Sequence, residues 1–377
     1  MIYLDNAATS FPKPEAVYRR VDEIQRHGGG NPGRGSHRMA LDASRVVFET
    51  RESIASLLNL DDSGRIVFTK NGTEAINLAL KGLAQPGDHL VTTTIEHNAV
   101  ANTVHRLEEE GVRVTRVGGA PDGTVMPLDI GKAIEAGTRL VCITHASNLF
   151  GTIEPVGEIA EVCHGRGVPL MVDAAQTVGA LPVDVTALGI DIVAATGHKA
   201  LYGPQGTGFL YVREGIEPLT LLIEGGTGEE GETIETPERY ESGTMNTPGI
   251  GGLGEGVEFL LNEGVVQVRR YEEELMGLLI DGLRAITGIT VIGSLDASQR
   301  VSLLSFTVDG REAGEVGRLL DDRYDIMTRS GLHCAPSAHR VAGTYPDGAV
   351  RVSPGYFTTP SEIAEFLDAI REIGGGG

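Results

Sequence analysis

Lysine is scarce in this sequence, and one lysine stands in an unusual place. Lys199 follows the apolar run 190–195 and precedes a turn rich in glycine and proline, "ALYGPQG". An amine whose pKa is lowered from about 10.4 becomes a nucleophile, so a lysine at the end of a buried strand indicates chemistry. The other four lysines stand in polar or helical contexts and are expected at the surface: Lys13, Lys70, Lys81 and Lys132.

Further polar residues follow other apolar runs of the sequence. Asp173 stands at the end of the buried strand predicted in "VPLMVDA", Asn148 follows "RLVCITH", and His97 follows "HLVTTT". Where parallel strands end along one edge of a sheet, such groups form a binding site. The candidates at strand ends are Gly72, Thr73, His97, Asn148, Asp173, Thr196, His198 and Lys199.

The types of these residues indicate a ligand. The turn at Gly72 and Thr73 opens a helix, whose N-terminus favours an anion such as phosphate, and Thr196 and His198 could donate to the same phosphate. Asp173 at a buried strand end needs a cationic partner, and a protonated pyridine nitrogen would be one. Lys199 could form an imine with an aldehyde, and a histidine could stack on a flat ring. Phosphate, pyridinium, aldehyde and ring together describe pyridoxal 5′-phosphate.

Each residue taken alone also has a plainer structural interpretation. Asp173 could cap a helix, Asn148 could belong to a turn, and His97 could be a buried structural histidine. Gly72 and Thr73 could be an ordinary helix start, and Lys199 could lie in a surface loop. Their joint placement at strand ends favours the functional interpretation.

The elements that must position these residues alternate along the first two thirds of the chain. Strand–helix alternation with such apolar strands predicts an α/β fold with a mainly parallel sheet covered by helices on both faces. The predicted strands are 65–69, 89–94, 112–117, 139–145, 168–174, 191–196 and 208–212. The predicted helices between them are 73–83, 97–110, 127–136 and 156–166.

The rest of the chain predicts a smaller α+β domain. A loop at 224–238 precedes a long helical region that reaches about residue 286, and shorter strands and two helices follow. We expect a large domain at 15–245, and a small domain made of 1–14 and 246–377. The terminal glycines are expected to be disordered.

Composition excludes several functions. The formal net charge of -21 disfavours binding to nucleic acid or to anionic lipid. Neither a signal peptide nor an apolar run of membrane-spanning length occurs, which predicts a cytoplasmic protein. The three cysteines, Cys142, Cys163 and Cys334, show no CxxC spacing, so we expect neither a disulfide framework nor a metal site.

A glycine motif at residues 249–254 has the spacing GxGxxG. A dinucleotide-binding fingerprint needs an apolar strand directly before it, whereas "YESGTMNTP" precedes this one. We therefore interpret it as a glycine-rich helix start, which leaves a nucleotide-binding oxidoreductase as a remote alternative.

The sequence resembles the class V, fold type I pyridoxal-phosphate enzymes over nearly its whole length, and within them the cysteine desulfurases and selenocysteine lyases. This resemblance implies the fold type I architecture, with a large cofactor-binding domain and a smaller one. The matching stretches are "YLDNAATS" (3–10), "KNGTEAINL" (70–78), "EHNA" (96–99), "HASNLFG" (145–151), "VDAAQ" (172–176), "TGHKALYGPQGTG" (196–208), "YESGTMNT" (240–247) and "RSGLHCA" (329–335).

The resemblance also implies roles for single residues. Lys199 resembles the Schiff-base lysine, and Asp173 would hold the pyridinium nitrogen. His97 would stack on the ring and help to move protons. Gln176 would bind the ring's phenolic oxygen, and the phosphate would lie against Gly72, Thr73, Thr196 and His198. Thr244 resembles a residue that reaches the phosphate of a neighbouring subunit in a homodimer. The substrate carboxylate would lie against Asn148 and Arg351, with Arg329 as a second candidate.

Cys334 resembles the cysteine that attacks the substrate's sulfur and keeps it as a persulfide. An unperturbed thiol is only roughly 3% thiolate at pH 7, so His333 or the substrate amine would have to assist. The short segment "RSGLHCAPSAHR" is similar to the Suf-type, or group II, enzymes, although Leu332 stands where these usually have a polar residue. Cys142 and Cys163 are expected in the core.

The resemblance thus implies a homodimer with shared active sites that converts L-cysteine or L-selenocysteine to L-alanine, and a possible sulfur-acceptor protein. One alternative is a class V aminotransferase or lyase for another amino acid, which would need no cysteine. Another is a non-catalytic sulfur-carrier scaffold, which the presence of Lys199 and Asp173 disfavours. The choice between sulfur and selenium stays open.

Overall fold

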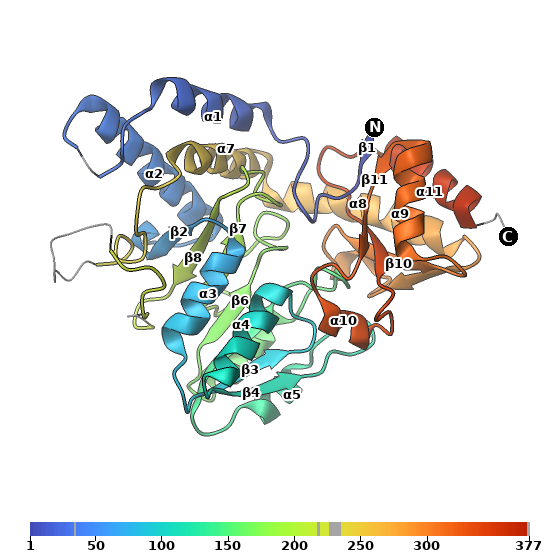
Figure 1. Ribbon diagram of the computed structural model, residues 1–377, viewed down its shortest axis with the longest axis horizontal. Helices are drawn as coiled ribbons and strands as arrows, with labels where there is room; N and C mark the ends of the chain where they lie inside the picture. The colour runs from blue at the N-terminus through green and yellow to red at the C-terminus, as the bar shows by residue number, and fades with distance from the viewer. Residues whose placement is uncertain (34, 217–218, 226–234, 375–377) are drawn as a thin grey trace.

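The computed structural model of the 377-residue chain describes residues 1–33, 35–216, 219–225 and 235–374. Two groups of elements are visible, a larger one around a wide sheet and a smaller one that holds the two ends of the chain (Figure 1). Most of the predicted loop 224–238, and the last three of the terminal glycines, lie outside the described residues.

The larger group is built on a seven-stranded sheet with the order β2-β8-β7-β6-β5-β3-β4. Five neighbouring strands, from β7 to β4, run parallel, and β8 runs antiparallel to both of its neighbours. The predicted, mainly parallel sheet is therefore confirmed. Its strands are β2 (Ile66–Thr69), β3 (His89–Thr93), β4 (Arg113–Val117), β5 (Thr138–Thr144), β6 (Leu170–Asp173), β7 (Ile192–Thr196) and β8 (Gly208–Val212).

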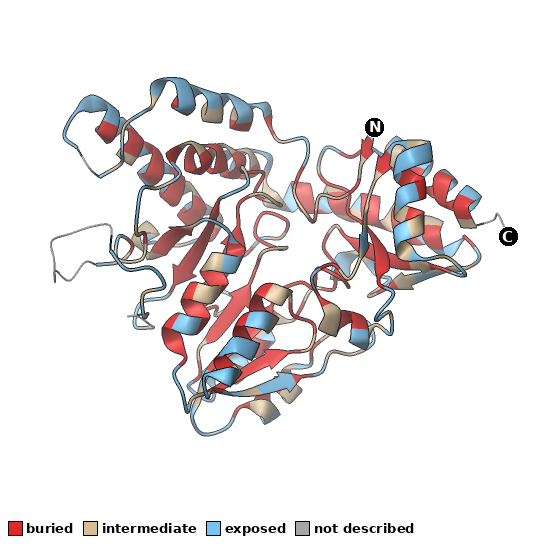
Figure 2. Cartoon of the chain, in the orientation of Figure 1, coloured by how far each residue is buried: buried red, intermediate tan, exposed pale blue. Residues whose placement is uncertain are grey.

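Helices cover both faces of this sheet, because neighbouring residues of each strand pack on opposite sides. Leu90 of β3 packs in the core with α3 and α4, whereas Val91 packs in the core that α2, α6 and α7 close. The strands are buried along most of their length, and only the edge strand β4 is largely exposed (Figure 2). The covering helices are α2 (Arg38–Leu57), α3 (Gly72–Leu83), α4 (Asn98–Glu109), α5 (Pro127–Ala133), α6 (Val156–His164) and α7 (Thr247–Glu263), and α1 (Glu15–His27) packs on α7 outside this layer.

The GxGxxG segment lies inside α7, as its interpretation as a helix start predicts. A Cβ atom at Gly251 would lie 2.4 Å from Ile24 of α1, and one at Gly254 would lie 2.6 Å from Thr50 of α2. These glycines serve close packing of α7 against α1 and α2, and not a nucleotide.

The smaller group contains an antiparallel sheet with the order β12-β13-β10-β9, and the pair β1 and β11. Its core includes Leu279 of α8, Phe306 of β10 and Phe366 of α11. The division at residue 245 stays a prediction. The elements are β1 (Ile2–Tyr3), α8 (Val265–Arg284), β9 (Ile289–Ile292), β10 (Leu304–Val308), α9 (Ala313–Tyr324), β11 (Ile326–Met327), β12 (Arg329–Gly331), α10 (Pro336–Val341), β13 (Ala349–Val352) and α11 (Pro360–Gly374), besides short 3-10 turns at Ser63–Arg65 and Ala297–Gln299.

No helix among the described residues is long and apolar enough to cross a bilayer.

Arg300 joins the two groups from a wholly buried position. Its guanidinium donates to the carbonyl oxygen of Phe150, beyond β5, and to those of Ile292, Ser294 and Leu303. Burial lowers the pKa of Arg300 to about 9. Because carbonyl oxygens satisfy the group, the cost of burying it is offset by hydrogen bonds.

We predict that Arg300→Met destabilises the protein by about 3 kcal/mol or more, because the change leaves buried carbonyl groups without a donor at about 1–3 kcal/mol each. Urea unfolding followed by circular dichroism measures the effect. Arg270→Met is the matched control, since the side chain of Arg270 is 81% exposed. Equal midpoints for the two variants would show that Arg300 does not join the groups.

Candidate active site

The structure brings the predicted strand-end residues to one edge of the large sheet. β3, β5, β6 and β7 run parallel, so their carboxyl ends meet there. The start of α3 lies beside the end of β7, where a Cβ atom at Gly72 would stand 3.5 Å from the Cβ atom of Thr196. The α3 turn and the Lys199 turn therefore face the same space.

Lys199 lies half-buried in the turn after β7. Burial lowers the pKa of its amine to about 8; Asp173 opposes this shift, and Arg351 and Arg329 add to it. A fraction of the amine is therefore neutral near pH 8, the state that a nucleophilic lysine requires.

The carbonyl group of His198 fixes the backbone just before Lys199. It accepts hydrogen bonds from the Ser10 N–H at 2.9 Å, from the hydroxyl groups of Thr9 and Ser10, and from Nζ of Lys13. The expectation that Lys13 lies at the surface is only partly met: the residue is half-buried, its Nζ donates to Ser10, and burial lowers the pKa of its amine to about 8. The segment "YLDNAATS" thus holds the Lys199 turn.

Asp173 is the last residue of β6 and is buried. Its Oδ1 atom accepts from the Ala175 N–H at 3.0 Å, which turns the carboxylate toward the strand end. The pairing of Thr144 with Asp173 in the sheet places the end of β5 directly beside it.

Glu96 is a buried carboxyl group that sequence reasoning missed, although it precedes His97 in "EHNA". Its Oε1 atom accepts from Oγ1 of Thr93 and from the N–H of Thr144, and Oε2 has no partner among the described residues. Burial raises the pKa of Glu96 to about 8, and Asp173 adds to the shift. Glu96 is therefore largely protonated at pH 7, which keeps a second negative charge away from Asp173.

His97 caps the N-terminus of α4. Its Nδ1 atom accepts from the Ala99 N–H at 3.0 Å, so the neutral ring carries its proton on Nε2. Burial lowers the pKa of His97, Asp173 opposes the shift, and Lys199 adds to it. A neutral imidazole is suited to lie against an aromatic ring and to exchange a proton.

Several buried polar atoms at this edge have no partner among the described residues. They are Oγ1 of Thr196, Nδ1 of His198, Oδ1 of Asn148 and Nε of Arg351. Buried polar groups are normally satisfied, so these atoms indicate a polar ligand. Gln176 lies nearby and donates to the Ala7 carbonyl at 3.2 Å, and Thr73 is exposed at the start of α3. The donor set suits a phosphate and a polar ring substituent.

Arg351 of β13 is almost wholly buried. It forms an ion pair with Asp5 at 3.0 Å and donates to the Asn148 carbonyl at 3.1 Å. Asp5 is a second residue that sequence reasoning missed, although "YLDNAATS" contains it. The ion pair holds the guanidinium in place and leaves Nε available to a substrate carboxylate.

Cys334 is exposed, and its sulfur lies 3.2 Å from Nη2 of Arg329. Its carbonyl accepts from the Asn98 N–H at 2.8 Å, which ties the cysteine loop to the start of α4 beside His97. The expectation that His333 assists the thiol is not met. The ring of His333 is buried and contacts His339 and the Arg329 carbonyl, and burial lowers its pKa to about 2.

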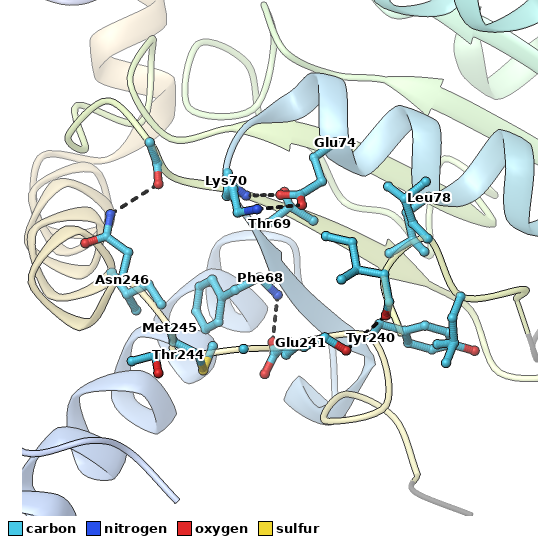
Figure 3. A pocket seen from close by; sticks show the side chains of 17 residues that line it. Phe68, Thr69, Lys70, Glu74, Leu78, Tyr240, Glu241, Thr244, Met245 and Asn246 are labelled. Carbon is cyan, nitrogen blue, oxygen red and sulfur yellow. Dashed lines mark hydrogen bonds and ion pairs between the residues drawn. The ribbon is translucent and has the colours of Figure 1, made fainter. Parts of the chain in front are cut away.

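Thr244 lies in a different place from these residues. It is exposed and lines a surface pocket with Phe68, Lys70 and Glu74, beside the start of α3 (Figure 3). Glu241 anchors this segment by accepting from the Phe68 N–H, as Figure 3 shows, and by a buried ion pair with Arg51. The predicted role of Thr244 across a subunit interface stays a prediction.

Comparison with known proteins identifies the family. The model of the class V aminotransferases matches residues 2–366. The chain belongs to the class V aminotransferase family. A probable cysteine desulfurase of Methanothermobacter thermautotrophicus is 38% identical, over 100% of this chain and 95% of that protein.

Solved structures agree with this assignment. The apo structure of a cysteine desulfurase from Thermococcus onnurineus superposes with a TM-score of 0.94 at 33% identity, over 100% of this chain and 95% of the other. The Escherichia coli cysteine desulfurase CsdA, in an S-sulfonic acid form, superposes with a TM-score of 0.87 at 28% identity. The match covers 98% of this chain and 94% of the other. The predicted family is confirmed, whereas the Suf-type subgroup stays a prediction. Enzymes of this family use pyridoxal phosphate, and the unsatisfied polar atoms at the strand ends fit that cofactor.

We predict that iodoacetamide modifies only Cys334 in the native protein. Cys142 and Cys163 are 1% and 0% exposed, and burial raises the pKa of both thiols. Mass spectrometry should find one label in the native chain and three in denaturant. A native Cys334→Ser variant that still takes up the label would contradict the assignment.

Proposed function

We propose that this protein is a pyridoxal-phosphate-dependent cysteine desulfurase, which converts L-cysteine to L-alanine and keeps the sulfur as a persulfide on Cys334. The observation that carries the proposal is the position of this exposed thiol. It stands on a loop that the Asn98 N–H and the Asn148 side chain tie to the strand-end site of Lys199 and Asp173. An aminotransferase would have no use for a thiol there.

The cofactor site we propose follows from the strand ends. Pyridoxal phosphate, when bound, supplies an electron sink that stabilises negative charge on the α-carbon of the amino acid. Asp173 would hold the pyridinium nitrogen, Gln176 the phenolic oxygen, and His97 the face of the ring. The phosphate would be bound by Gly72 and Thr73 at the start of α3, and by Thr196 and His198.

The remaining residues act on the substrate. Arg351, which Asp5 holds in place, would bind the carboxylate of the amino acid together with Asn148, and Arg329 is a second candidate for this contact. The neutral amine of Lys199 can take the α-proton and return it.

The sulfur transfer needs no further reagent. The thiolate of Cys334 attacks the substrate sulfur, a sulfur–sulfur bond forms, and the carbon–sulfur bond breaks. Protonation of the carbon then yields alanine. One L-cysteine and one enzyme thiol are thereby converted to one L-alanine and one enzyme persulfide. Arg329, in contact with the sulfur, offers positive charge to the thiolate. We also propose that L-selenocysteine can be used, that the protein is a cytoplasmic homodimer with shared sites through Thr244, and that an acceptor protein takes the sulfur.

We predict that borohydride treatment of the yellow holoprotein fixes the cofactor on Lys199 and not on Lys13. The amines of both residues have pKa values lowered to about 8, but the hydrogen bonds of Lys13 go to Ser10 and to the His198 carbonyl. Peptide mapping identifies the modified residue. Lys13→Met should keep the adduct and Lys199→Met should lose it, and an adduct on Lys13 would overturn the site.

We predict that Cys334→Ala still changes colour with L-cysteine but loses sulfide and alanine formation by at least about 10³-fold, because only the sulfur transfer needs the thiol. Absorbance spectra and product assays separate the two steps. L-Selenocysteine should retain more activity, since a selenolate leaves more readily than a thiolate. Turnover of L-cysteine at the original rate would reject the desulfurase mechanism and favour a class V aminotransferase or lyase.

A further inference from the structure

The loop that carries Cys334 has an unusual backbone. His333 and Cys334 are consecutive residues with φ values of 50° and 58°, in the left-handed region that residues with a Cβ atom rarely adopt. Such a conformation persists only where the surroundings impose it. Two contacts impose it from the side of the large sheet: the His333 carbonyl accepts from Nδ2 of Asn148 at 2.5 Å, and the Cys334 carbonyl accepts from the Asn98 N–H.

A pair of buried histidines supports the loop from its other side. The rings of His333 and His339, the latter from α10, are stacked with centroids 5.3 Å apart and an interplanar angle of 20°. Nδ1 of His333 lies 3.2 Å from Nε2 of His339, whose Nδ1 lies 2.7 Å from Oγ1 of Thr344. Nε2 of His333 lies 3.4 Å from the Arg329 carbonyl oxygen.

These four groups can be hydrogen-bonded in only one direction while the rings are neutral. The Arg329 carbonyl can only accept, so His333 must carry its proton on Nε2 and must accept at Nδ1. His339 must then donate from Nε2, and its Nδ1 accepts from the Thr344 hydroxyl. Burial lowers the pKa of His333 to about 2 and that of His339 to about 4, so both rings are neutral at pH 7.

The chain of hydrogen bonds ends at the residue that contacts the thiol. Arg329 begins β12, its backbone pairs with Arg351 of β13, and its side chain lies 3.2 Å from the Cys334 sulfur. The N–H group at Nε2 of His339 therefore supports both ends of the short segment from Arg329 to Cys334. It donates to His333, next to Cys334, and it thereby keeps the proton of His333 on the nitrogen that faces the Arg329 carbonyl.

We propose that His339 is a positioning residue for the Cys334 thiol, which it holds against Arg329 by donating from Nε2 to His333. The proposal deepens the proposed function and rests on Cys334 as the sulfur-accepting residue. His339 touches neither substrate nor cofactor in this role. Only the Nε2 atom of His339 is required for this role, because only Nε2 contacts the loop that carries Cys334.

The two nitrogens can be tested separately with amide side chains. Glutamine places an amide close to the position of Nε2, and asparagine places one close to that of Nδ1. His339→Gln should therefore keep the bond to His333, whereas His339→Asn keeps only the contact with Thr344. The pair is matched in polarity, so a merely structural need for a polar group would not distinguish the variants.

Two measurements are made on each variant. The first is the rate of Cys334 alkylation by iodoacetamide in the full-length holoprotein before substrate is added. Cys334 is exposed, so access does not limit this rate, and Arg329→Met gives the reference for a thiol without its arginine contact. The second is sulfide formation from L-cysteine by the holoprotein, alongside the colour change on adding L-cysteine.

We expect His339→Gln to alkylate at the original rate, and His339→Asn to alkylate at the rate of Arg329→Met. Sulfide formation should fall between about tenfold and 10²-fold in His339→Asn, as for a displaced reacting group, with the colour change retained. The proposal is overturned by any result other than an unchanged alkylation rate in His339→Gln together with a changed rate in His339→Asn. An equal change in both variants also overturns it. Full turnover by Cys334→Ala would instead refute the desulfurase function, which the alkylation rates do not test.

Discussion

The lowered pKa of the Lys199 amine depends on a balance that most of the site maintains. Burial and two arginines favour the neutral amine, and Asp173 favours the charged one. A second ionised carboxylate at this edge would shift the balance toward the cation. The structure limits this effect, because the charge of Asp5 is offset by Arg351 and burial keeps Glu96 largely protonated. Asp173 is thereby left as the carboxylate that acts on the lysine and on a cationic ring.

The same edge of the sheet is costly to fold without a ligand. Buried polar atoms without a partner cost about 1–3 kcal/mol each, and Thr196, Asn148 and Arg351 each present one. The phosphate of a cofactor would accept from Thr196 and the carboxylate of a substrate from Arg351, whereas Oδ1 of Asn148 needs a donor such as an ammonium group. A ligand that binds these atoms in the folded protein therefore also stabilises the fold.

The sequence predicted those features that depend on neighbouring residues. Strands such as 191–196 were recognisable because a parallel sheet buries both faces, and Asp173 and Lys199 were recognisable because they directly follow such strands. Individual ion pairs and strand pairings between distant segments were not predictable. Asp5 meets Arg351 across 346 positions, and β1 pairs with β11 through two residues each, too few to form a pattern. The partial burial of Lys13 was missed because it depends on the fold around His198, and the place of His333 was missed because its ring turns toward α10.

The chemistry of the site is divided between the two groups of elements. Asp173 ends a strand of the large sheet and Lys199 and His97 follow two others, whereas Arg329, Cys334 and Arg351 belong to β12, its loop and β13. The first set suits activation of an amino acid at its α-carbon, which is common to many reactions. The second set decides which bond breaks next, because it holds the thiol. The cysteine loop is fixed to the large group by the backbone of Asn98, by the side chain of Asn148, and by Ala335, which packs in the core of the large sheet. A thiol on that loop is what separates a desulfurase from an aminotransferase built on the same sheet.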